Sequence, residues 1–264
     1  MVSLILASAS SRAQRADELM LRVGDWVHEF VQQFANVVAE EEYVPRIRGV
    51  GRPRLRSDYL LVQYPGSAGN WLSFRDVVAV EGNSLRNQPE RLSKLFLESF
   101  EGAVEQANAI TKHSARYISP LSDPLLGIAV LQRRYQPRFR YTIADLDQGV
   151  GRGVRRINFE EMARPTILRD GEKDLPTQGT AWAVEATGRI VRTELHLGIA
   201  SRLSRTVVLT TAFKRDDALQ IDVPATMAEG FMLGSNAGVS GTAYYTRFRR
   251  FSVRTTEAID VSKP

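Results

Sequence analysis

The last third of the sequence constrains the fold most, because it alternates strand-forming segments with turn-forming residues. Each segment is rich in Val, Ile, Thr, Tyr, Phe or Trp, which favour strands. The connections carry Gly, Asn, Asp or Ser, which favour turns. The expected strands are Thr180–Ala186, Ile190–Leu197, Thr206–Phe213, Leu219–Met227 and Thr242–Arg254. Strands that follow one another so closely indicate a sheet of antiparallel neighbours.

An amphipathic helix precedes these strands. Apolar residues recur every three or four positions from Leu19 to about Glu42, and Phe30 and Phe34 lie in the apolar stripe. Asp17, or a serine before it, is the expected N-cap, and Glu40-Glu41-Glu42 is the expected polar end of the helix. Two or three strands are expected next, at Tyr43–Arg48, Leu55–Tyr64 and Trp71–Val80.

The middle of the chain returns to a helical period over about 89–134, with segments at Pro89–Ser99, Glu101–Tyr117 and Leu125–Arg134. No strand alternates with a helix in the manner of a parallel sheet. We therefore expect one mainly β domain over 15–256. Its fold class is an antiparallel half-barrel or strongly curved sheet, with an N-terminal helix and a helical insert packed in its concavity.

The first residues resemble the second half of a secretory signal peptide. A short apolar run leads to Ala7-Ser8-Ala9, which matches an Ala-x-Ala cleavage pattern. Residues 1–14 are thus a truncated signal peptide or a disordered tail, and 257–264 form a C-terminal tail. We expect an exported protein, periplasmic or extracellular, with a cytoplasmic location as the alternative. No apolar run reaches the roughly 18 residues of a transmembrane span.

Residues with catalytic or metal-binding patterns are sparse. The chain has no Cys, which excludes disulfides, thiolate zinc sites and Cys nucleophiles. Its histidines, His28, His113 and His196, lack the spacing of a metal site, although His196 follows Glu194 by two residues and shares its face on a strand. No G-x-S-x-G motif occurs. We expect no catalytic residue, no metal and no cofactor.

Clusters of Arg interleaved with aromatic residues are the positive signal for binding. The net charge is +5, and Arg outnumbers Lys by 30 to five. Such clusters can hold anionic lipid headgroups or nucleic acid, and we regard nucleic acid as an unlikely partner. A strand with a charged outer face and an aromatic inner face produces the same alternation. The candidate ligand-binding residues are Arg138, Arg140, Arg247, Arg249, Arg250 and Arg254.

The last strand requires an irregularity, because strict alternation from Tyr244 leaves neither face apolar. Burial of an unpaired Arg costs far more than a local kink. A one-residue β-bulge at Arg249-Arg250 would resolve the conflict. The residues then expected on the inner face are Tyr244, Thr246, Phe248, Phe251 and Val253.

The order of helix, strands, helical interruption and long antiparallel run resembles the Lol-type lipoprotein-carrier superfamily of exported bacterial proteins. That resemblance implies a half-closed barrel that wraps a helical plug and holds acyl chains. No functional residue of the carriers matches a position here. Individual stretches resemble exported bacterial proteins without an assigned activity: Leu55–Val62, Arg164–Arg169, Ala186–Leu195 and Gly241–Phe251.

Three hypotheses about function follow. The first is a non-enzymatic exported protein that binds a hydrophobic or amphiphilic ligand, such as a lipid or lipoprotein acyl chain, in the concavity. It requires an apolar pocket, and a concave face packed solid by Leu126, Val130 and Leu131 would contradict it. The second is a structural or protein-interaction domain of the cell envelope without a small ligand. The third is a hydrolase whose site is hidden by sequence order.

Overall fold

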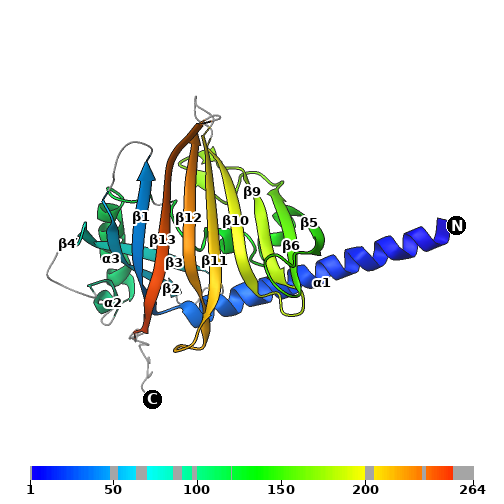
Figure 1. The fold of residues 1–264 in the computed structure, drawn as a ribbon, viewed down its shortest axis with the longest axis horizontal. Helices are drawn as coiled ribbons and strands as arrows, with labels where there is room; N and C mark the ends of the chain where they lie inside the picture. The colour runs from blue at the N-terminus through cyan, green and yellow to red at the C-terminus, as the bar shows by residue number, and fades with distance from the viewer. Residues whose placement is uncertain are drawn as a thin grey trace, which may run out of the picture.

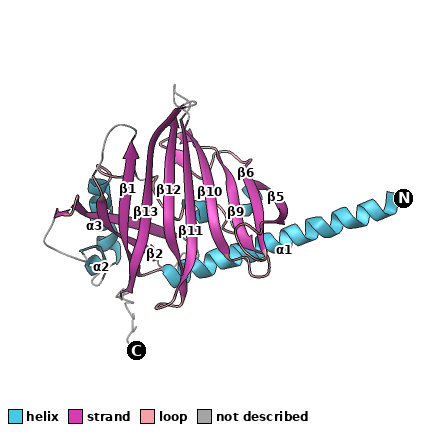
Figure 2. Cartoon of the chain, in the orientation of Figure 1, coloured by secondary structure: helices cyan, strands magenta, loops and turns pink. Residues whose placement is uncertain are grey.

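The computed structural model describes residues 2–47, 53–63, 70–85, 91–96, 100–119, 121–199, 205–233 and 236–251. Its main feature is an open antiparallel sheet in the order β4-β3-β2-β1-β13-β12-β11-β10-β9-β6-β5 (Figures 1 and 2). The strands are β1 (Val37–Ile47), β2 (Leu55–Gln63), β3 (Trp71–Val80), β4 (Asn83–Ser84), β5 (Phe139–Leu146), β6 (Val154–Glu161), β9 (Thr177–Val184), β10 (Ile190–Ile199), β11 (Arg205–Asp216), β12 (Ile221–Leu233) and β13 (Asn236–Arg250). A separate hairpin joins β7 (Arg169–Asp170) and β8 (Lys173–Asp174).

The helices are α1 (Val2–Phe34), α2 (Arg91–Leu95), α3 (Phe100–Ser114) and α4 (Leu126–Ala129), followed by the short 3-10 helix η1 (Gln136–Arg138). The predicted fold class is confirmed: an open antiparallel sheet carries an N-terminal helix and a helical insert. The five strands expected in the last third correspond to β9 to β13, because alternation of branched and polar residues between turns favours half-buried strands.

The predicted end of the first helix is wrong. α1 ends at Phe34, and Val37 to Glu42 belong to β1 instead. Asn36 adopts a φ of 62°, outside the helical region, and its N–H donates to the carbonyl of Leu61. The spacing of Val37 and Val38 fits a strand as well as a helix, and β-branched residues favour the strand. The expected N-cap at Asp17 is also wrong, since the helix continues through it.

Two hydrophobic clusters cover the two faces of the sheet. Neighbouring residues of β2 belong to different clusters, Leu61 to one and Leu60 to the other. The larger cluster lies on the concave face and includes α1 and the segment around α4. The smaller cluster joins β1, β2 and β3 to α2 and α3. The insert is therefore divided, with α4 in the concavity and α2 and α3 on the opposite face.

The predicted bulge in the last strand exists but lies two residues earlier. Arg247 and Phe248 together face Ala39 of β1, and Arg247 adopts a φ of 51°. Tyr245 is buried and Tyr244 is exposed, so the predicted inner face is wrong. Because the extra residue falls between Tyr245 and Phe248, both aromatic rings reach the concave cluster although they are three positions apart.

Phe251 follows the bulge by three positions and packs against the other cluster, with its ring 6.4 Å from that of Phe96. Phe248 and Phe251 therefore lie on opposite faces of the sheet. Val253 and Arg254, which were expected in this strand, lie outside the described residues.

Candidate functional site

α1 fills the concave face of the sheet. Figure 1 shows this helix crossing the sheet, while its N-terminal turns project beyond the β5 edge. Phe30 and Phe34 are 2% and 0% exposed, and the ring of Phe30 lies 5.6 Å from that of Phe213 on β11. Val130 and Leu131 beside α4 are fully buried, and Leu126 is partly buried. The centre of the concavity is thus packed, and open space occurs beside α1.

A buried ion pair ties the concave side of β1 to β3. The Arg75 guanidinium donates to both oxygens of Glu41 over 2.6 and 2.9 Å, and also to the carbonyl of Ser122 over 2.6 Å. Arg75 is 6% exposed and Glu41 is 0% exposed. Burial by itself would lower the pKa of Arg75, but Glu41, Tyr245 and Asp123 together raise this pKa by more, so the guanidinium stays charged.

Three tyrosines extend this network to the loop before α4. Tyr245 donates to Glu41 over 2.8 Å, Tyr59 donates to Asp123 over 2.9 Å, and Tyr43 donates to Glu229. Burial raises the pKa of each phenol, and the adjacent carboxylates raise it further. The phenols therefore remain protonated donors. Because Ser122 also donates to Glu229, the network fixes the 121–125 segment against the sheet and has a structural role.

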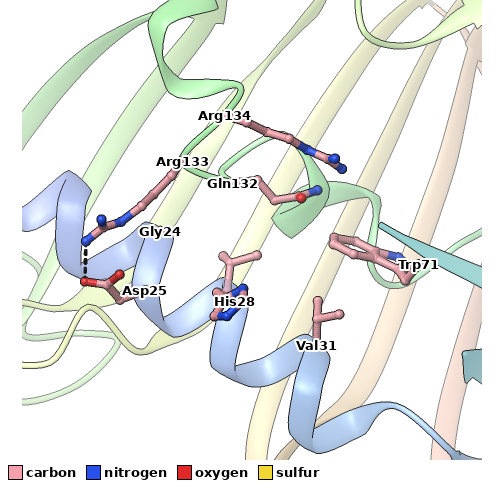
Figure 3. A pocket seen from close by; sticks show the side chains of 9 residues that line it. Gly24, Asp25, His28, Val31, Trp71, Gln132, Arg133 and Arg134 are labelled. Atoms are coloured by element: carbon pink, nitrogen blue, oxygen red, sulfur yellow. Dashed lines mark hydrogen bonds and ion pairs between the residues drawn. The ribbon is translucent and has the colours of Figure 1, made fainter. Parts of the chain in front are cut away.

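A cleft of about 340 Å³ lies on one side of α1, between the helix and the segment 132–134 (Figure 3). We name it the Trp71 cleft. Val27, Val31 and Trp71 form an apolar wall, and all three belong to or pack against the concave core. His28 is exposed and borders the same space. An apolar wall that continues into the core gives this cleft affinity for hydrocarbon groups.

Two arginines border the mouth of the Trp71 cleft. Arg133 pairs with Asp25 over 2.6 Å, and both side chains are more than half exposed (Figure 3). Arg134 contacts Asn70 of the loop before β3 and stacks 4.6 Å from the ring of Tyr135. Exposed ion pairs contribute little to stability, so Arg133 can exchange Asp25 for an anionic ligand at small cost.

Gly24 permits the close approach of α1 to the 132–134 segment. A side chain at this position would collide with the aliphatic part of Arg133. Gln136 fixes the segment by donating to the carbonyls of Met20 and Leu131 over 2.8 and 3.1 Å. Sequence reasoning did not identify this cleft, because its walls lie about a hundred residues apart. The available signal was the isolated Gly24 within a helical pattern, which often indicates close packing.

The arginines predicted to bind a ligand do not form one surface. Arg138 and Arg140 are at the β5 edge of the sheet, whereas Arg247, Arg249 and Arg250 are on β13, and the strands β12, β11, β10, β9 and β6 lie between. Arg254 lies outside the described residues.

Each described member of this set already contacts a nearby acceptor. At the β5 edge, Arg140 pairs with Glu160 over 2.5 Å, and Arg138 donates to the carbonyl of Pro165 and lies 3.5 Å from the Glu161 carboxylate. The acceptors of the β13 arginines are Glu40 for Arg247, Asp58 for Arg249 and the carbonyl of Gln33 for Arg250. Anion binding by these residues stays a prediction, now divided between two separate patches.

His196 and Glu194 lie on one face of β10 as predicted, with His196 Nε2 2.9 Å from the Glu194 carboxylate. Among the described residues, no group of three His, Asp or Glu side chains is arranged to hold a metal ion. A search of the described helices for a segment long and apolar enough to span a membrane finds none.

No family model and no curated protein matches the sequence. Among solved structures, a LolA superfamily protein from Nitrosomonas europaea is similar, with 9% sequence identity and a TM-score of 0.42. The alignment covers 88% of this chain and 93% of that protein. The open antiparallel sheet is established by the strand order, independently of this likeness.

Proposed function

We propose that this protein binds an amphiphile without chemical conversion, with the apolar chain in the Trp71 cleft and the headgroup at Arg133 and Arg134. The observation that carries the proposal is the continuity between this cleft and the apolar concave core. Its volume of about 340 Å³ lies within the roughly 300–1,000 Å³ of typical small-ligand sites. A lipid or a lipoprotein acyl chain fits this description.

A longer chain would have to displace part of α1. The helix covers the concave face, so its outward movement would expose the apolar surface that it now buries. An acyl chain could replace those contacts, because apolar burial is non-directional and scales with area. In this proposal α1 acts as a helical plug, and the acyl chain of the ligand occupies part of the space that α1 fills in the free protein.

A substitution at His28 tests this use of the cleft. The change His28→Trp should fill the cleft from an exposed position and weaken binding of a neutral lauroyl amphiphile about tenfold, since the chain loses its apolar contacts. Displacement of an environment-sensitive fluorophore would measure the affinity. The matched control is Leu21→Trp, an exposed position on the same helix that does not line the cleft. Equal affinities of both variants would contradict the proposal.

We also propose that the protein is exported, and the Ala7-Ser8-Ala9 pattern is the observation that supports export. A fusion of the gene's native upstream region and these residues to a reporter active only outside the cytoplasm should be active. A silent reporter, together with intact residues 1–13 on the cellular protein, would contradict export.

The packed centre of the concave face favours a second candidate, a structural or interaction domain of the cell envelope without a small ligand. The two candidate functions predict different results in the fluorophore displacement experiment. A purely structural domain would show no saturable binding and no difference between the two Trp variants.

A further inference from the structure

A second cleft, of about 500 Å³, borders α1 and is here named the Arg215 cleft. Its helical residues include Trp26, Glu29 and Gln33, whereas the Trp71 cleft uses Gly24, His28 and Val31. At 3.6 residues per turn these two sets lie on opposite sides of the helix. The other wall of the Arg215 cleft is formed by hairpin ends at one rim of the sheet, which contribute Arg152 and Arg215.

The two walls of the Arg215 cleft carry opposite charges that are not paired with each other. Arg152 and Arg215 are exposed, and neither side chain forms an ion pair or hydrogen bond with another residue in the described part of the chain. Glu29 stands on α1 across the cleft, and its partner there is the neutral amide of Gln33 at 2.6 Å. Besides the Arg189–Asp222 ion pair on the sheet, the cleft therefore has two further cations on the sheet rim and the Glu29 carboxylate on the helix.

Asp222 adds a buried acceptor to this cleft. Its Oδ2 accepts a hydrogen bond from the Trp26 indole over 3.0 Å, and this bond fixes the orientation of the indole ring. Its Oδ1 accepts no hydrogen bond within the described structure, although the residue is only 7% exposed and Arg189 Nη1 lies 3.7 Å away. A buried oxygen without a hydrogen bond is unfavourable, so a donor that reaches it would be held strongly.

The floor of the cleft is aromatic. Trp26 and Phe30 line it, and both rings pack against Phe213 in the concave core, at 5.9 and 5.6 Å between centroids. A chain attached to a polar head could therefore lie on apolar surface while the head remains between the charged walls.

We infer that the Arg215 cleft binds a zwitterionic amino-phosphate headgroup. The phosphate lies at Arg152 and Arg215, because guanidinium groups match phosphate oxygens in geometry and charge. The ammonium group lies at Glu29 and donates toward Asp222 Oδ1. This assignment rests on the proposed function in one respect, that the headgroup carries an acyl chain. The same chemistry occurs in a phospholipid headgroup and in a free amino-phosphate.

Calorimetric titration with three probes below their micellar concentrations tests this assignment. The probes are lauroyl lysophosphatidylethanolamine, lauroyl lysophosphatidylglycerol and free phosphoethanolamine. The wild-type protein should bind the ethanolamine lysolipid about tenfold more tightly than the glycerol lysolipid, because only the former supplies a cation to Glu29. Tighter binding of the lysolipid than of free phosphoethanolamine identifies a lipid source, whereas equal affinities overturn the lipid assignment and retain the headgroup site.

Two neutralising variants locate the site. Arg215→Gln should weaken both lysolipids about tenfold, whereas Glu29→Gln should weaken the ethanolamine lysolipid alone by a similar factor. The matched controls are Lys214→Gln, at the adjacent exposed position of β11, and Glu18→Gln, on an exposed part of α1 away from the cleft. Losses of equal size in the controls, or equal affinity for the two lysolipids, would overturn the inference.

The His28→Trp variant separates this inference from the proposed function. His28 borders only the Trp71 cleft, so this variant should leave the preference for ethanolamine unchanged. If His28→Trp keeps its preference for ethanolamine, the Arg215 cleft is supported. If the same variant binds the neutral amphiphile as tightly as the wild type does, ligand binding in the Trp71 cleft is contradicted. If His28→Trp loses the preference for the ethanolamine lysolipid over the glycerol lysolipid, headgroup binding in the Arg215 cleft is contradicted.

Discussion

Replacement of Arg75 by Met should lower the free energy of unfolding by about 3–5 kcal/mol, because it leaves the Glu41 carboxylate buried without its cation. Glu41 is 0% exposed and receives two hydrogen bonds from Arg75, so water cannot substitute for the lost partner. Urea denaturation followed by circular dichroism measures the loss.

Two controls separate the buried charge from side-chain size. The double variant Arg75→Met with Glu41→Met should recover much of the lost stability, since neither charge then remains in the interior. Arg140→Met removes one partner of the Arg140–Glu160 pair, whose side chains are 63% and 50% exposed, and should cost less than about 1 kcal/mol. Equal losses for Arg75→Met and Arg140→Met would contradict the buried network.

Truncation of Phe34 to Ala should also cost about 3–5 kcal/mol, because a fully buried ring leaves a cavity that its surroundings fill only in part. The Phe34 ring contacts those of Phe30 and Phe248, at 5.4 and 6.3 Å between centroids. The comparison is Leu21→Ala, since Leu21 is 49% exposed on the same helix and should tolerate truncation within about 0.5 kcal/mol. A loss below 1 kcal/mol for Phe34→Ala would mean that α1 does not pack on the sheet.

The strands of the last third were predictable because each pattern is local. Alternation within a segment and turn residues between segments are both properties of a few neighbouring residues. The end of α1 was not predictable in this way, since Val37 and Val38 satisfy both a helical and a strand pattern. The pairing of Asn36 with Leu61 decides between them, and that contact is tertiary.

The bulge in β13 shows a similar limit. The excess of Arg and aromatic residues indicated that the strand must be irregular, but the position depends on its neighbours. Tyr245 faces the concave side, where it donates to Glu41, and this contact sets the register before the bulge. The sequence of β13 alone contains no information on that partner.

The candidate clefts were beyond sequence reasoning for a geometric reason. Each joins α1 to segments more than a hundred residues away, such as Arg133 in one cleft and Arg215 in the other. The predicted ligand-binding arginines Arg138, Arg140, Arg247, Arg249 and Arg250 cluster in the sequence, yet the sheet separates them into two patches. Clusters along the chain predict that some surface is rich in arginine. The pairing of the strands decides on which surface each arginine lies.

Native mass spectrometry with lipid extraction, on protein purified from its own host, tests the central claim most directly. The wild-type protein should retain a co-purifying amphiphile whose acyl chains are all of one type. The His28→Trp variant should retain less of this amphiphile than the Leu21→Trp variant does. An amphiphile carrying ethanolamine phosphate would agree with both clefts. Wild-type protein that is free of any amphiphile, or equal retention by the two variants, would contradict binding in the Trp71 cleft.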